Sequence, residues 1–245
     1  MLQRYHLPSL HTALVWIHSP RQESDAGVAR KRFAFEEIFF IQLDRARRRV
    51  AYQNQSAQQI KISSAELETF LKQLPFPLTT AQDRAIKVIL KDLDRAEPMA
   101  RLLEGDVGSG KTVVAASAAY ATVQADGEVA YMAPTEILAI QHFESFIEYF
   151  RHTGISIGLI TGSGCRKFPS KISASSKTGG WTDISRTQLL KWVANGEIPI
   201  LIGTHALIQK TVHFKNLAYV IVDEQHRFGT AQRQKLVRKD RINPH

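Results

Sequence analysis

Residues 103–112 read Leu-Glu-Gly-Asp-Val-Gly-Ser-Gly-Lys-Thr, and this stretch decides the fold. Four residues separate Gly105 from the Gly-Lys-Thr run at 110–112, which is the spacing of a phosphate-binding loop. A strand is predicted to end at Leu103, and the Val-Val-Ala-Ala run at 113–116 predicts a helix after the loop. The sequence therefore predicts a nucleotide-binding α/β domain.

Each position of the loop has a chemical reason. Glycines allow unusual dihedrals and let backbone N–H groups approach phosphate oxygens closely. The helix beginning near Lys111 would point its positive N-terminus at the same phosphates. Lys111 can reach the β- and γ-phosphates, and the Thr112 hydroxyl can ligate Mg²⁺. The predicted nucleotide ligands are Gly105, Gly108, Ser109, Gly110, Lys111 and Thr112.

A carboxylate is expected at the end of a neighbouring strand, because Mg²⁺ needs a second protein ligand. The run 218–222 is apolar and is followed directly by Asp223 and Glu224. Ligands of open parallel sheets lie at the carboxyl ends of the strands. Asp223 would hold Mg²⁺, and Glu224 would orient or deprotonate the attacking water. The guanine-reading Asn-Lys-x-Asp of small GTPases is not found, which disfavours that class.

Short β-rich runs alternate with helical segments from Leu78 onward. The predicted strands are 100–103, 128–132, 156–161, 198–203 and 218–223, and the predicted helices are 80–96, 111–125, 136–151 and 185–195. This alternation implies a mostly parallel sheet with helices on both faces. The stretch 164–183 is rich in Ser, Lys and Gly, so we expect a flexible surface insertion there.

The part of the chain before Leu78 lacks this alternation of strands and helices. Residues 1–29 are predicted to be irregular, with Pro8 and Pro20 as breakers. One long helix is predicted over 30–51 and a short one over 64–73. We therefore expect a helical leader over 1–74 and a nucleotide-binding α/β domain over 75–245. Basic clusters at both ends of the long helix fit either a solvated face or phosphate contacts.

Composition narrows the classes further. The 245 residues include 32 Lys plus Arg against 23 Asp plus Glu, a net charge of +9. This excess makes a polyanionic partner plausible, although many basic proteins bind nothing acidic. The longest apolar runs have five or six residues, whereas a membrane span needs about 20, so none is expected. The lone Cys165 can form neither an internal disulfide nor a Cys-based zinc site, which fits a cytoplasmic protein.

The Asp-Glu-Gln-His run at 223–226 resembles the DExH box of superfamily-two helicases and translocases. Other segments agree: 78–82 looks like the adenine-sensing Q segment, 133–139 like motif Ia, 161–163 like the TGS segment and 203–209 like motif Ib. Taken together, the residues of these motifs are similar to those of the RecG family of ATP-dependent DNA helicases. The run Arg-Lys-Arg-Phe-Ala-Phe at 30–35 is also similar to a segment of that family. Transcription-repair coupling translocases are the alternative, but they typically carry Glu where Gln225 stands.

The resemblance implies that residues 75–245 form a RecA-like ATP-binding lobe, and it implies roles for further residues. Gln82 would hydrogen-bond adenine, and Gln225 and His226 would couple the ATP site to DNA. The residues implied to contact the DNA backbone are Thr135, Gly162, Ser163 and Thr204. The implied partner is forked or branched DNA, remodelled in recombination and repair by a protein that we expect to be monomeric.

The family also implies parts that do not occur in these 245 residues. A Thr-Ala-Thr motif and a second RecA-like lobe with arginine fingers would follow, and a wedge domain would precede. Such arginines are worth about 10³–10⁵ in rate in related NTPases. We therefore expect this chain to bind Mg-ATP in half of a cleft and to hydrolyse it weakly. A catalytically silent, nucleotide-dependent DNA-binding module is the alternative from another class.

Overall fold

The computed structural model describes residues 3–170, 180–224, 227–229, 232, 235–236 and 243–245. The chain divides into two compact units, Met1–Asn54 and Gln55–His245. Residues 55–74, which we assigned to the leader, pack with the larger unit, because helix α3 (Ser64–Lys72) contacts helix α5 (Lys111–Gln124). Among the described residues, no helix is both long and apolar enough to cross a bilayer.

The first unit is helical almost from its start. The short 3₁₀ helix η1 (Gln3–Tyr5) is followed by α1 (Leu10–His18) and α2 (Glu23–Gln53). The prediction of an irregular segment over 1–29 was therefore wrong. Local caps explain the difference: Ser9 Oγ accepts from the Thr12 N–H, and buried Asp25 accepts from the N–H of Arg21 and of Gln22. These caps start helices on the far side of each proline.

The helices of the larger unit follow the prediction closely. Besides α3 and α5, they are α4 (Thr80–Leu93), α6 (Glu136–Phe150) and α7 (Arg186–Ala194). Within the described residues, four of these five helices begin after a Ser or Thr whose hydroxyl accepts from a first-turn N–H; these residues are Ser63, Thr79, Thr135 and Ser185. Such side chains satisfy backbone donors that the helix leaves free. Helix α5 instead begins after Gly110 in the phosphate loop.

Six strands form one mixed sheet in the order β4-β3-β2-β5-β1-β6. Their bounds are Glu128–Met132 (β1), Ile157–Ile160 (β2), Cys165–Phe168 (β3), Thr182–Asp183 (β4), Ile200–Gly203 (β5) and Leu217–Val222 (β6). Strands β2, β5, β1 and β6 pair in parallel, and β3 and β4 extend the sheet antiparallel. The predicted α/β class, with a mostly parallel sheet flanked by helices, is confirmed.

The expected strand over 100–103 does not form. These residues make no ladder with a neighbouring strand, and Leu102 is largely exposed. A strand needs a neighbour, and the edge beside β6 is occupied by His245: its N–H donates to Ala218 O and its carbonyl accepts from Val220 N.

The stretch 164–183 is not simply a surface insertion, because its two ends form β3 and β4. Cys165 and Phe168 bury their side chains against the core, and the Arg166 guanidinium lies over the Trp181 ring, 4.2 Å from its centroid. The Ser- and Lys-rich middle of this stretch, 171–179, lies outside the described residues.

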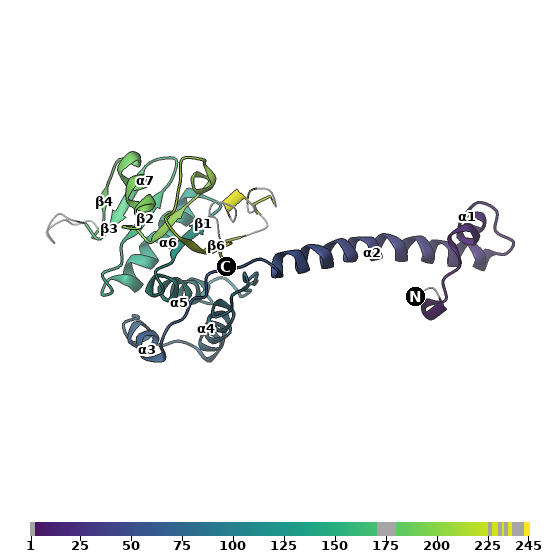
Figure 1. Cartoon of the computed structure of the whole chain (residues 1–245), viewed down its shortest axis with the longest axis horizontal. Helices are drawn as coiled ribbons and strands as arrows, with labels where there is room; N and C mark the ends of the chain where they lie inside the picture. The colour runs from purple at the N-terminus through teal and green to yellow at the C-terminus, as the bar shows by residue number, and fades with distance from the viewer. Residues whose placement is uncertain (1–2, 171–179, 225–226, 230–231, 233–234, 237–242) are drawn as a thin grey trace. The chain divides into compact units, whose positions relative to one another are not determined.

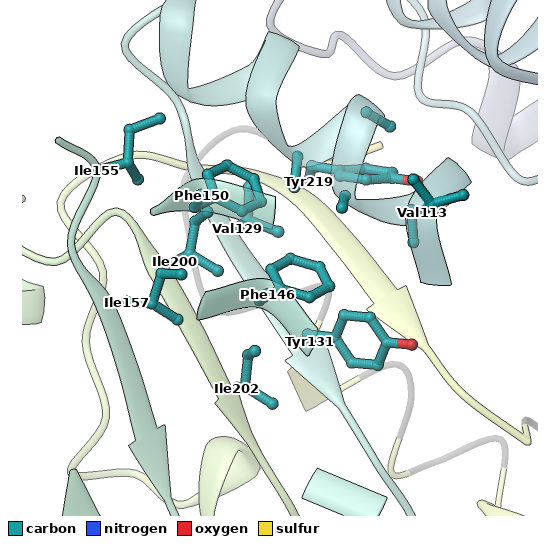
Figure 2. Close-up of a cluster of buried hydrophobic side chains, with 14 of the residues drawn as sticks. Val113, Val129, Tyr131, Phe146, Phe150, Ile155, Ile157, Ile200, Ile202 and Tyr219 are labelled. Atoms are coloured by element: carbon teal, nitrogen blue, oxygen red, sulfur yellow. The ribbon is translucent and has the colours of Figure 1, made fainter. Parts of the chain in front are cut away.

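The core has two halves, one on each face of the sheet. Helices α3 to α6 cover one face and α7 the other (Figure 1). Figure 2 shows the first half, where alternate residues of β1, β2 and β5, such as Tyr131, Ile157 and Ile202, meet Phe146 and Phe150 of α6. The intervening residues face α7, so these strands are buried on both faces. All four parallel strands therefore end at one edge, where the predicted motifs begin.

His245 ties three distant segments of the larger unit together. Its ring Nδ1 accepts from the Met99 N–H, its Nε2 lies 2.7 Å from Gln58 O, and its side chain is buried. Burial lowers the pKa of His245, so the folded chain favours the neutral ring. This stabilisation is fully present above the ordinary pKa of about 6.5 and is lost as the pH falls below it.

We expect His245→Ala to lower the free energy of unfolding by about 1–3 kcal/mol at pH 7.5, because two half-buried backbone groups, the Met99 N–H and the Gln58 carbonyl, each lose a hydrogen bond. The deficit relative to the parent chain should shrink at pH 5.5, since only the parent carries the titrating ring. Urea unfolding at both pH values measures this. His213→Ala, at an exposed histidine, is the control. A deficit of the same size at both pH values would contradict the assignment of a neutral ring.

Candidate nucleotide-binding site

The loop before α5 has the backbone that a phosphate cradle requires. Gly108 and Gly110 adopt φ values of 80° and 78°, a left-handed conformation that L side chains rarely adopt. A Cβ on Gly110 would also lie 2.3 Å from Gln82 Nε2. Gly105 has another role: its missing side chain leaves space for Ser109 Oγ, which would lie 2.6 Å from a Cβ. The expected unusual dihedrals therefore occur at two of the three glycines.

Lys111 lies over this loop. Its Nζ donates to the carbonyls of Gly105 and Asp106 at 2.6 and 2.9 Å. An ammonium group has three N–H donors, so one remains for a further acceptor. The N–H groups that begin α5 point out of the helix at the same place. Together they form a positive, donor-rich surface that suits phosphate oxygens.

Gln82 connects α4 to the loop. Its Oε1 accepts from the Thr79 N–H at 2.8 Å, and its Nε2 donates to Ser109 O at 2.9 Å. Each half of the amide can make one more hydrogen bond, so an adenine contact is compatible with this geometry and stays a prediction. The structure adds that Gln82 holds the loop in place, which the sequence resemblance did not indicate.

Asp223 follows β6 at the carboxyl edge of the sheet. Its N–H donates to Met132 O of the neighbouring strand, which fixes the backbone there. The carboxylate Oδ2 lies 2.8 Å from His142 Nε2, and Oδ1 accepts from the Glu224 N–H. The hydrogen bond from His142 lowers the pKa of Asp223 most, and the charge of Lys111 lowers it further. Asp223 is therefore ionised at neutral pH, and it lies close enough to the loop to interact electrostatically with Lys111.

Glu224 adopts a left-handed backbone, with φ of 45°. This conformation is strained for a residue with a side chain and is often found at functional sites. Its Oε2 forms an ion pair with Arg227 Nε at 2.8 Å, but this buried oxygen accepts no hydrogen bond from the described residues. The assigned role in activating water stays a prediction. Gln225 and His226, the proposed coupling residues, lie outside the described residues.

The donors at this edge fit a magnesium ion that arrives with a nucleotide. Thr112 is the second residue of α5 and provides a hydroxyl, and Asp223 provides an ionised, partly exposed carboxylate. Within the described ranges, no group of three His, Cys, Asp or Glu side chains could hold a metal unaided. Mg²⁺ commonly takes one or two protein ligands and fills its shell with phosphates and water. The residues present therefore suit this ion.

The residues implied to contact DNA come together at the same edge. Thr135 follows β1, Gly162 and Ser163 follow β2, and Thr204 follows β5. Thr135 Oγ1 accepts from the Leu138 N–H, so its hydroxyl hydrogen stays available for a phosphate. DNA contact by these residues stays a prediction, but the sheet order explains how segments far apart in sequence meet.

Glu136 is a residue that the sequence reasoning missed. Its Oε1 accepts hydrogen bonds from the hydroxyls of Ser163 and Thr161. The Ser163 hydroxyl is therefore already directed at a carboxylate, and its assignment as a phosphate donor is weaker than that of Thr135. Glu136 fixes the loop after β2 to the start of α6. An acidic residue directly after the Thr135 cap was visible in the sequence, but its partners were not.

His142 and Tyr131 were also missed. His142 is buried on α6 beside Asp223, and the Tyr131 hydroxyl lies 3.5 Å from His142 Nδ1. A histidine in an apolar helix gives no signal of this kind by itself. Only the packing of α6 against β1 brings these groups together with Asp223.

Comparisons with known proteins agree with this geometry. The DEAD/DEAH box helicase family matches residues 79–243. The chain is 39% identical over 252 residues to the ATP-dependent DNA helicase RecG of Aquifex aeolicus, covering 100% of this chain and 30% of that protein. It is 44% identical over 237 residues to RecG of Bacillus subtilis, covering 96% of this chain and 32% of that protein. The chain thus spans about a third of the relatives that it matches.

A solved structure of RecG bound to a three-way DNA junction is also similar. It superposes with a TM-score of 0.73 at 39% identity, covering 93% of this chain and 29% of that one. The matched family region contains the phosphate loop, Asp223 and every segment that lines the carboxyl edge of the sheet. With its loop, its acidic box and its sheet in the arrangement described, this chain belongs to the DEAD/DEAH box helicase family.

Proposed function

We propose that this chain is the ATP-binding lobe of a RecG-like DNA helicase or translocase. The observation that carries the proposal is the convergence, at one sheet edge, of the Lys111 loop, ionised Asp223 and the segments beginning at Thr135, Thr161 and Thr204. A nucleotide and a DNA backbone could both be reached from this edge. Forked or branched DNA as substrate is supported by the relative bound to a three-way DNA junction. We also propose a role in recombination and repair.

The chain's own residues would divide the chemistry as follows. Backbone N–H groups of the loop and the Lys111 ammonium would bind the phosphates of ATP, and Gln82 would face adenine. Thr112 and Asp223 would hold Mg²⁺, which neutralises charge on the phosphates when bound. Glu224 would orient or deprotonate the attacking water. Thr135 and its neighbours would contact DNA phosphates, which position the protein without reading sequence.

The first test is ATP binding and hydrolysis by this chain, with and without forked DNA, beside a Lys111→Ala control. We expect ATP binding with weak turnover, because the arginines that stabilise the transition state in related NTPases are not among these residues. Absence of ATP binding by a folded chain would overturn the proposal. Robust ATP turnover that depends on Lys111 would instead show that this chain stabilises the charge of the transition state without a second lobe.

Glu224→Gln is expected to leave nucleotide affinity within about twofold and to lower hydrolysis by about 10²–10⁴-fold, because the amide cannot accept a proton. Single-turnover hydrolysis of radiolabelled ATP detects such slow rates. Glu144→Gln, at an exposed glutamate of α6, is the matched control. Retained turnover in the Glu224 variant would remove its assigned role.

A further inference from the structure

A buried hydrogen-bonded chain runs from the core to the carboxylate of Asp223. His142 Nε2 lies 2.8 Å from Asp223 Oδ2, and His142 Nδ1 lies 3.5 Å from the Tyr131 hydroxyl. The Tyr131 and His142 rings also pack against each other with centroids 4.6 Å apart. Both residues are buried, and the side chain of His142 is 11% exposed. Tyr131 of β1 and His142 of α6 therefore lie one behind the other, next to the carboxylate that follows β6.

The chemistry of the three groups sets a direction for these hydrogen bonds. Ionised Asp223 can only accept, so His142 Nε2 carries the hydrogen that it donates. In the neutral ring Nδ1 is then an acceptor, which the Tyr131 hydroxyl can satisfy. Burial raises the pKa of Tyr131, so the hydroxyl keeps its proton. Each group thus orients the next, ending at Oδ2 of Asp223.

This arrangement leaves the carboxylate with little rotational freedom. Oδ2 is held by the imidazole and Oδ1 by the Glu224 N–H. Partners behind a metal-binding carboxylate or imidazole typically fix its orientation, and their loss costs about 10–100-fold in metal affinity or activity. The side chain of Asp223 remains partly exposed, with His142 on its buried side.

His142 also belongs to the helix that starts at the predicted DNA contact. Helix α6 begins directly after Thr135, and seven residues of helix span about 10 Å to His142. Glu136, the first residue of α6, accepts hydrogen bonds from two hydroxyls of the loop after β2. A displacement of the start of α6 would therefore be transmitted to the group that holds Asp223.

We propose that His142 is a positioning residue, which orients Asp223 for the metal ion that accompanies ATP and links that carboxylate to the helix beginning at Thr135. The inference rests on the proposed nucleotide site. A histidine that only fills the core would stabilise the fold without affecting how the nucleotide responds to Mg²⁺, so the two roles predict different measurements.

The experiment measures binding of a fluorescent ADP to the whole 245-residue chain, first in EDTA and then as Mg²⁺ is titrated in. We expect His142→Ala to raise the Mg²⁺ concentration at half effect by about tenfold, while affinity in EDTA stays within about twofold. His142→Gln should restore the parent value to within about threefold, because the glutamine amide N–H can occupy the position of Nε2–H. His152→Ala, at an exposed histidine, is the control.

A second variant keeps the inference testable where His142→Ala does not fold. Tyr131→Phe keeps the ring and removes only the hydroxyl that orients His142, and we expect it to raise the same Mg²⁺ concentration by about two- to threefold. A folded His142→Ala chain with the parent Mg²⁺ response would overturn the inference, as would a His142→Gln chain no better than alanine. A parent chain that binds no nucleotide in EDTA or Mg²⁺ would instead overturn the proposed function.

Discussion

Lys111→Ala is expected to abolish measurable ATP binding. The Lys111 ammonium is held over the phosphate loop by the carbonyls of Gly105 and Asp106, and it is the charge that the loop would direct at the phosphates of ATP. A hydrogen bond to a charged group contributes about 1.5–3 kcal/mol. The ammonium keeps one donor for a phosphate, so its removal corresponds to at least about 1.5–3 kcal/mol, or about a 10–10²-fold loss of affinity. The loss of a full positive charge beside the phosphates adds to this.

Isothermal titration calorimetry with a non-hydrolysable ATP analogue measures this change directly. Lys87→Ala is a suitable control, because Lys87 is an exposed lysine of α4 in the same unit and pairs with Asp83 one turn away. Circular dichroism should show that both variants keep their helix content. An unchanged affinity in the folded Lys111 variant would mean that the loop does not bind the phosphates.

Phe146→Ala is expected to cause the largest loss of stability. Phe146 is fully buried on α6, stacks on Phe150 with ring centroids 5.5 Å apart and meets the Tyr131 ring edge-on at the same distance (Figure 2). Removing a buried phenyl ring forfeits its transfer free energy and leaves a cavity, at a cost of about 3–5 kcal/mol. That is a large share of the stability of an ordinary domain.

Urea unfolding, followed by circular dichroism, measures the loss. Phe76→Ala is the matched control, since Phe76 is 39% exposed and makes one edge-on contact with Tyr149. We expect it to cost about 1 kcal/mol. Equal losses in the two variants would show that α6 is not anchored through Phe146 as described. Because Phe146 supports Tyr131, the core variant should also weaken the Mg²⁺ response of nucleotide binding.

The parts of this protein that could be predicted from sequence are those that depend on neighbouring residues. The phosphate loop follows from the spacing between Gly105 and Lys111, and four helices follow from hydroxyl caps such as Thr79 and Thr135. The four parallel strands follow from short apolar runs, because strands buried on both faces are apolar throughout. Local spacing and composition carry each of these signals.

Helix starts were mispredicted where a cap was overlooked. Pro20 reads as a breaker, but the carboxylate of Asp25 satisfies the donors just beyond it, so α2 begins at Glu23. The segment 100–103 was mispredicted for a different reason. Its apolar residues suit a strand, but hydrogen bonding to a neighbouring strand is a property of the whole sheet, and His245 lies beside β6 instead.

The sequence by itself determined that a nucleotide loop and an acidic box occur in this chain, because each is a short run of adjacent residues. Only the tertiary structure decided what orients them. His142 meets Asp223 across 81 positions of sequence, and Glu136 meets Ser163 across 27. These contacts arise because β1 lies between β5 and β6 and α6 packs on the same sheet. Strand order is set by long-range pairing and burial, which leave no local pattern in the residues that they bring together.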